Sequence, residues 1–134
     1  MKKTKLKKRR TRKDWTNEDW RKEAVELAKK VAKKRDEYIC VTCGKSADQG
    51  YQIHGSHILP ESKFHRLSVE PLNIMAQCFK CHSLWHEHPK GQDWFDEMYP
   101  TRLKELFKLQ ADLESCIKPD YQKIYEDLKE QLYD

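Results

Sequence analysis

The residues best suited to chemistry in this chain are cysteines and histidines. Four of the five cysteines form two Cys-x-x-Cys pairs, Cys40 with Cys43 and Cys78 with Cys81. Two such turns supply the four thiolates of a tetrahedral zinc site, and a site with four protein ligands is structural rather than catalytic. A redox pair or unrelated buried thiols are the alternatives, although redox use does not explain two matched pairs. Cys116 has no partner, and we expect it to be a small core residue of a C-terminal helix.

All six histidines lie between Ile53 and Pro89: His54, His57, His65, His82, His86 and His88. A single histidine is usually structural or solvated, but six around a predicted zinc site indicate chemistry. Imidazole can take up a proton near neutral pH, and it can bind a divalent ion. Hydrolysis of a phosphodiester needs such a base, a cation on the phosphate and a rigid frame.

The sequence patterns predict the elements that position these side chains. Thr16 and Asp19 have the spacing of a helix N-terminus, and apolar residues at helical spacing extend that helix to about residue 36. Residues 51–59 and 72–77 resemble short strands on either side of a Pro-bounded loop at 60–71. Cys78 then opens a helix that breaks at 89–91, and further helical patterns follow. The ends are therefore predicted to be helical around a small β-β-α unit.

The positive charge is concentrated at the N-terminus. Residues 1–13 hold nine of the 27 Lys and Arg residues and no acid, which leaves an excess of acid in the remainder. A dense basic arm attracts phosphate by releasing counterions, so it favours a nucleic-acid partner; a merely solubilising tail is the alternative. The candidate contacts are Lys7, Lys8, Arg9, Arg10, Arg12 and Lys13 in the arm and Arg66 in the Pro-bounded loop.

Targeting signals are not evident in the chain. No apolar stretch follows the basic N-terminus, and no run approaches the roughly 20 apolar residues of a membrane span. We therefore expect a soluble, cytoplasmic protein without a membrane partner.

The order of the candidate residues resembles the HNH, or ββα-metal, endonuclease family. The similar stretches are Ser56-His57-Ile58-Leu59-Pro60, Leu72-Asn73-Ile74 and the segment from Cys78 to His82. The spacing of His54 and His57 around Gly-Ser is also similar to the phage recombination-endonuclease (NinG-like) branch. The resemblance covers about residues 37–99.

The resemblance implies an α+β fold in which a small, zinc-stapled ββα-metal core, similar to a treble clef, is flanked by N- and C-terminal helices. It implies that His57 is the general base, that Asn73 braces the loop between the strands, and that His82 binds a catalytic divalent ion. His86 lies one helical turn after His82 and is a second candidate ligand. The implied activity is DNA hydrolysis with Mg²⁺, Mn²⁺ or a similar ion, which leaves 5′-phosphate and 3′-hydroxyl ends.

One position departs from the family pattern. The residue before the base is usually Asp or His, and here it is Ser56. His54 shares a strand face with Ser56 by alternation and is a candidate to replace it as a ligand. If neither binds, a non-catalytic zinc module that binds nucleic acid is the alternative, and a partner-binding role of the C-terminal helices is a third.

We therefore expect four segments. They are a basic disordered arm at 1–13, an N-terminal helix at 14–36, an HNH core at 37–99 and C-terminal helices at 100–134. DNA is the expected partner, and the sequence leaves the oligomeric state open. The resemblance to the phage branch implies a role in DNA recombination in a host cytoplasm.

Overall fold

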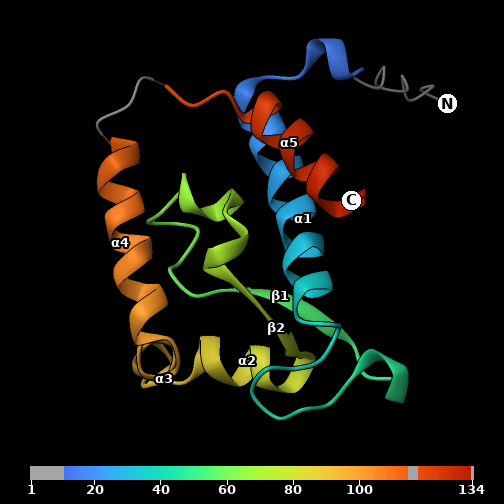
Figure 1. Cartoon of the computed structure of the whole chain (residues 1–134), viewed down its shortest axis with the longest axis vertical. Coiled ribbons are helices and arrows are strands. Elements are labelled where there is room, and N and C mark those ends of the chain that lie inside the picture. Colours follow the sequence, from blue (N-terminus) through green and yellow to red (C-terminus); the bar gives the residue numbers. More distant parts are fainter. Residues whose placement is uncertain (1–10, 115–117, 134) are drawn as a thin grey trace, which may run out of the picture.

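Two short strands lie at the centre of the molecule, with helices on both sides (Figure 1). The computed structural model describes residues 11–114 and 118–133. Their helices and strands are α1 (Asn17–Arg35), β1 (Ile53–His57), β2 (Ile74–Cys78), α2 (Phe79–Glu87), α3 (Gly91–Met98), α4 (Pro100–Glu114) and α5 (Tyr121–Tyr133). Short 3₁₀ turns lie at Arg12–Asp14, Ala47–Gln49, Leu67–Val69 and Pro71–Asn73. The predicted α+β class is confirmed.

The two faces of the sheet pack against different helices. β1 and β2 are antiparallel, and the register pairs His54 with Gln77 and His57 with Ile74. Ile74 packs in the core formed with α1, whereas the next residue, Met75, packs in the core formed with α3 and α4. Because side chains alternate along a strand, His57 faces α1, and His54 faces α2.

α1 and α5 lie side by side and enclose the first core (Figure 1). The predicted start of α1 is confirmed: Thr16 accepts from the backbone of Asp19, and the Asp19 side chain accepts from the backbone of Thr16. The buried face of α1 carries Trp20, Ala24 and Ala28, which meet Tyr121, Tyr125 and Leu128 of α5. Gly55 of β1 lies directly under Lys29, because a Cβ placed there would come within 2.6 Å of the lysine Cγ.

The second core lies on the other side of the sheet. Met75 packs there with Ile58 and Leu67, together with Phe95 of α3 and Leu106 of α4. The loop between the strands is therefore fixed by apolar contacts from both directions, and Leu67 is fully buried. This buried loop frames the end of β1, where His57 lies.

The outer edge of β2 is covered by the segment that follows α1. The carboxylate of Asp36 accepts from the backbone of Ala76 at 2.9 Å, and the backbone of Val41 donates to Ala76 at 2.9 Å. Arg35 donates to the carbonyl of Ile74 at 2.6 Å. These bonds attach the C-terminal end of α1 to the sheet.

The boundaries differ from the sequence expectations in three places. β1 spans only Ile53–His57 and not residues 51–59. β2 begins at Ile74 and not at Leu72, because residues 71–73 form a 3₁₀ turn with Pro71 at its first position. Arg12 and Lys13, which we expected in a disordered arm, belong to a 3₁₀ turn, and the Arg12 guanidinium lies 5.5 Å from the Trp15 ring centroid. The candidates Lys7, Lys8, Arg9 and Arg10, and also Cys116, fall outside the described residues.

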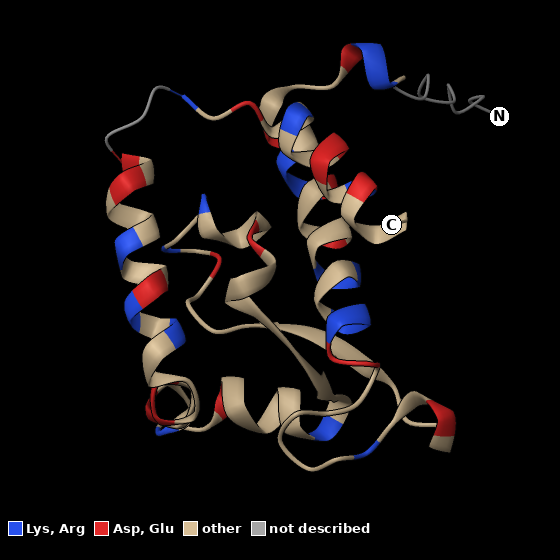
Figure 2. Cartoon of the chain, viewed as in Figure 1, with Lys and Arg blue, Asp and Glu red and all other residues tan. Residues whose placement is uncertain are grey.

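Charge is distributed unevenly along α1. Its first half contains four acidic residues, Glu18, Asp19, Glu23 and Glu26, and two basic ones, Arg21 and Lys22. Its last two turns contain only basic charges: Lys29, Lys30, Lys33, Lys34 and Arg35 (Figure 2). This order matches the polarity of the helix dipole. None of the helices in the described part of the chain combines the length and apolar character needed to cross a membrane.

Candidate active site and zinc centre

The four cysteines of the two Cys-x-x-Cys pairs come together between β2 and the loop after α1. Their sulfur atoms all lie within 4.8 Å of one another, and the Sγ atoms of Cys43 and Cys78 are 3.7 Å apart. A tetrahedral zinc with bonds of about 2.3 Å would separate two sulfur ligands by about 3.8 Å. All four thiols are free of disulfide bonds. The cluster therefore fits a structural zinc ion.

Backbone geometry brings the two pairs together. Gly44 has a φ of 80° and allows the chain to turn directly after Cys43. The backbone of Cys40 donates to Lys45, which closes this turn. Cys78 ends β2 and caps α2, with its sulfur accepting from the backbone of Cys81 at 3.5 Å. A metal held here would tie the segment after α1 to the start of α2.

The thiols influence one another strongly. Burial raises the pKa of Cys40, but backbone hydrogen bonds from Cys78, Cys43 and Thr42 outweigh it and lower this pKa to about 7. Burial and the neighbouring cysteines raise the pKa of Cys81. Four thiolates packed together repel one another, and a bound dication removes that penalty. The donor set is therefore suited to a metal ion rather than to four isolated thiols.

Three of the predicted metal ligands form a second cluster next to the cysteines. The Nδ1 atoms of His54 and His82 are 2.9 Å apart, and the ring centroids of His82 and His86 are 4.7 Å apart. His54 comes from β1, whereas His82 and His86 lie one turn apart on α2. The structure thus brings together side chains from both elements, as alternation along the strand predicts.

Burial keeps His82 and His86 neutral. It lowers the pKa of His82 to about 4, with further lowering by His86 and His54. Burial also lowers the pKa of His86. Neutral imidazole is the form that binds a metal ion. Among the described residues, however, only the four cysteines form a group of three or more donor atoms that all lie within 4.8 Å of one another.

Ser56 occupies the position where the family usually has a ligand. Its side chain is fully buried, and its Oγ lies 3.0 Å from Nε2 of His86. Ser56 therefore contacts a candidate ligand and can fix the orientation of that imidazole. His54, two residues earlier on the same face, has its Nδ1 atom 2.9 Å from Nδ1 of His82.

His57 is held in one tautomer by the loop between the strands. Its Nε2 lies 2.9 Å from the carbonyl oxygen of Ser68. A carbonyl only accepts, so Nε2 carries the hydrogen, and Nδ1 of the neutral ring is an unprotonated acceptor. Burial lowers the pKa of His57, and the bond to Ser68 offsets this only in part. At neutral pH the ring is therefore uncharged and able to accept a proton.

His57 and His86 border the same open space, although His57 and His54 face opposite sides of the sheet. His57 and His86 together line two adjoining cavities. One also contains Trp85 and Gln92, and the other also contains Arg21 and His65. A substrate bound at the end of β1 could touch both histidines.

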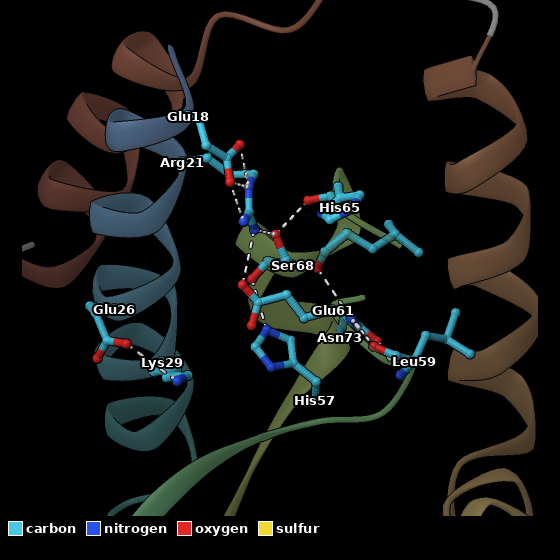
Figure 3. Close-up of polar contacts among 11 residues, drawn as sticks. Glu18, Arg21, Glu26, Lys29, His57, Leu59, Glu61, His65, Ser68 and Asn73 are labelled. Carbon is cyan, nitrogen blue, oxygen red and sulfur yellow. Dashed lines mark hydrogen bonds and ion pairs between the residues drawn. The ribbon is translucent and has the colours of Figure 1, made fainter. Parts of the chain in front are cut away.

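Asn73 braces the loop that carries Ser68. The residue is fully buried, its Oδ1 accepts from the backbone of Leu59, and its Nδ2 donates to the carbonyls of Leu59 and Leu67 (Figure 3). Its own carbonyl accepts from the backbone of Ile58 at 2.8 Å. These bonds join the residues after β1 to the turn before β2, so Asn73 fixes the surroundings of His57 without touching it.

Sequence reasoning missed a buried ion pair beside His57. Arg21 of α1 is 6% exposed and bonds to Glu18, Glu61 and Ser68 (Figure 3). A signal was present in the sequence, since Arg21 precedes Ala24, Val25 and Ala28 at helical spacing and so falls on the apolar stripe of α1. A buried charge on such a stripe requires ion-pair or hydrogen-bond partners.

The predicted nucleic-acid contacts lie apart from one another in the described residues. Arg12 and Lys13 are exposed in the turn before α1, and the Arg12 guanidinium also lies 5.7 Å from the Tyr125 ring centroid. Arg66 is half-buried and lines a cavity with His65 and residues around Pro119. The structure brings neither group into direct contact with His57.

The central part of the chain is similar to a known protein family. Residues 40–88 match the model of the HNH endonuclease family. This HNH segment starts at the first cysteine ligand and ends just after α2, so it contains His57, Asn73 and His82. The match suggests that these residues, which include the four-cysteine cluster, form an HNH nuclease domain. Searches of curated proteins and of solved structures gave no significant match.

Proposed function

We propose that this protein is a metal-dependent endonuclease that hydrolyses DNA phosphodiester bonds, with His57 as the general base. The observation that carries the proposal is the hydrogen bond from Nε2 of His57 to Ser68, because it leaves Nδ1 as an acceptor. The match of the HNH segment supports the same reaction.

His57 would take the proton of the attacking water on Nδ1. Its lowered pKa keeps the ring neutral before the reaction, and burial keeps its orientation fixed. Asn73 would hold the loop that orients the base. A base positioned in this way contributes a factor of roughly 10²–10⁴ to a hydrolysis rate.

His54, His82 and His86 would hold the catalytic ion. When bound, the ion would supply positive charge to the phosphate and to the departing 3′ oxygen. Three imidazoles favour Ni²⁺ or Zn²⁺ over Mg²⁺ and Mn²⁺, which prefer oxygen ligands. The cysteines would hold a separate Zn²⁺ that only stabilises the fold.

The finer assignment follows the sequence resemblance. We propose the NinG-like branch, which implies a phage protein that cuts DNA during recombination and acts in the host cytoplasm. The products would carry 5′-phosphate and 3′-hydroxyl ends. The basic residues at 1–13 and Arg66 would add affinity that does not depend on DNA sequence.

A cleavage assay tests the proposal. Purified protein is incubated with supercoiled plasmid, with branched DNA and with RNA, each with Mg²⁺, Mn²⁺ or Ni²⁺. We expect cleavage of DNA that is lost in both His57→Ala and His82→Ala, whereas Glu105→Ala, on an exposed residue of α4 that lines neither cavity, should cleave like the parent. Cleavage that persists without His57, or no cleavage under any condition, would contradict it.

Ser56 favours one alternative. This residue has a neutral hydroxyl at the position where the family usually has a metal ligand. If the catalytic ion is not bound there, the chain would be a zinc module that binds nucleic acid without cutting it. This alternative requires salt-sensitive DNA binding that is the same in the parent and in His57→Ala.

A further inference from the structure

α1 lies outside the HNH segment, yet it places a buried charge close to the candidate base. Arg21 donates from Nη1 to Oγ of Ser68 at 3.1 Å, and the carbonyl of the same serine accepts from His57 at 2.9 Å (Figure 3). We propose that Arg21 is a positioning residue that holds His57 through Ser68. The proposal rests on the function proposed above for His57.

Ser68 is fixed on several sides. Its backbone donates to Phe64 at 3.0 Å and to His65 at 3.3 Å, and its hydroxyl donates to the carbonyl of His65. The side chain is fully buried. Arg21 is the remaining partner, and it reaches Ser68 from a different element. The direction of the Ser68 carbonyl therefore depends on how α1 is docked.

Arg21 is suited to positioning rather than to binding substrate. Its Nη2 donates to Glu18 at 2.6 Å, its Nη1 also donates to Glu61 at 2.9 Å, and its Nε donates to Glu18. Two carboxylates balance its charge, so little attraction remains for a phosphate. These partners raise the pKa of Arg21 and keep it ionised.

The arrangement completes a path of hydrogen bonds from a helix outside the HNH segment to the base. Glu18 and Glu61 orient the guanidinium, the guanidinium orients the Ser68 turn, and the turn fixes the tautomer of His57. A base that shifts by a fraction of an ångström loses reactivity without a comparable loss of substrate binding.

The test combines kinetics with NMR of the full chain. The variants are Arg21→Gln, which breaks the path, and Ser68→Ala, which removes the linking hydroxyl but keeps Arg21 paired with both carboxylates. Asn17→Ala is the matched control, because Asn17 also ties α1 to a distant segment, through Pro119 and Tyr121, but has no link to Ser68. The readouts are kcat and KM for DNA cleavage and the ¹⁵N shifts of the His57 ring, which report its tautomer.

We expect kcat to fall by about 10- to 100-fold in Arg21→Gln, with KM changed less than about twofold. The kcat of Ser68→Ala should also fall, and both variants should show a mixture of His57 tautomers. Asn17→Ala should keep the parent kcat and tautomer. An unchanged tautomer in the two test variants, or a fall in kcat no larger than in the control, would overturn the proposal. If the parent cleaves nothing, the proposed function fails, and the ¹⁵N shifts alone decide whether Arg21 positions His57.

Discussion

The side-chain amide of Asn73 forms a two-way pair of hydrogen bonds with the backbone of Leu59. Oδ1 accepts from the Leu59 N–H at 2.8 Å, and Nδ2 donates to the Leu59 carbonyl at 3.1 Å. A third bond, to the carbonyl of Leu67 at 3.1 Å, extends the connection to the turn that carries Ser68. One fully buried side chain thus holds both ends of the loop between the strands.

Asn73→Ala should destabilise the protein and slow cleavage together. It leaves buried backbone groups without partners, which costs about 3 kcal/mol of unfolding free energy. Urea unfolding of the zinc-loaded protein measures this loss. Asn73→Asp should lose nearly as much unfolding free energy, because the carboxylate cannot donate to the carbonyls of Leu59 and Leu67. A loss below about 1 kcal/mol, the value of an ordinary exposed hydrogen bond, would contradict the bracing role.

Removal of a cysteine ligand should release the zinc. Cys40→Ser is expected to abolish tight metal binding and to lower Tm by more than about 10 °C, because structural zinc contributes folding free energy. Metal analysis and thermal unfolding by circular dichroism measure the two effects. Cys116→Ser serves as the control and should retain one zinc per chain. A parent protein that binds no zinc would show that the thiols serve another purpose.

The pH dependence of cleavage should reflect the burial of His57. Burial lowers the pKa of His57 below its ordinary value of 6.5, and only the neutral ring can accept a proton. Activity is therefore present above the lowered pKa and is lost as pH falls through it. The acid limb of kcat/KM should lie below pH 6.5, and a bound divalent cation would move it lower still. An acid limb above pH 6.5 would be inconsistent with a buried neutral base.

Ser56→Asp should strengthen binding of the catalytic ion. The new carboxylate would replace a neutral hydroxyl 3.0 Å from His86, and oxygen ligands favour Mn²⁺ and Mg²⁺. Calorimetric titration of zinc-loaded protein with Mn²⁺ should show about tenfold tighter binding, with Ser56→Ala as the control that removes the hydroxyl without adding a ligand. Weaker binding in Ser56→Asp than in Ser56→Ala would indicate that no ion lies beside this residue.

Gly55→Ala should push α1 away from the sheet. A Cβ at this position would lie 2.7 Å from Cβ of Lys29 and 3.1 Å from its Cα, so the backbone of the helix must move. Such overpacking costs about 1–3 kcal/mol, which urea unfolding would detect. Gly50→Ala is a control for the general effect of losing a glycine, although its φ of 90° adds local strain. A stability equal to that of the parent would contradict the close contact.

Much of the core could be predicted because its signals are local. Paired cysteines, a capping box and alternation along a strand each depend on residues close in sequence, and the structure agrees with all three. The mutual approach of His54 and His82 also follows from alternation once the start of α2 is fixed by Cys78.

The Arg21 path could not be predicted in the same way. It joins α1 to Ser68, 47 residues later, and its geometry depends on how α1 packs across the sheet. Sequence spacing indicates that Arg21 is buried, but it does not identify Glu61 or Ser68 as the partners. The tautomer of His57 depends on a backbone carbonyl, a group that every residue possesses and that sequence therefore cannot single out.

The alternation of side chains along β1 places the candidate base and the candidate metal ligands of this strand on opposite faces of the sheet. His57 and its supporting network lie towards α1, whereas His54, Ser56 and the α2 histidines lie on the other side. The two sides meet where His86 and His57 line the same cavities, so a substitution at His54 is expected to disturb the proton acceptor less than one at His86. Insertion of one residue before His57 would exchange the two sides at once, so this short strand should tolerate substitution far better than any change in length.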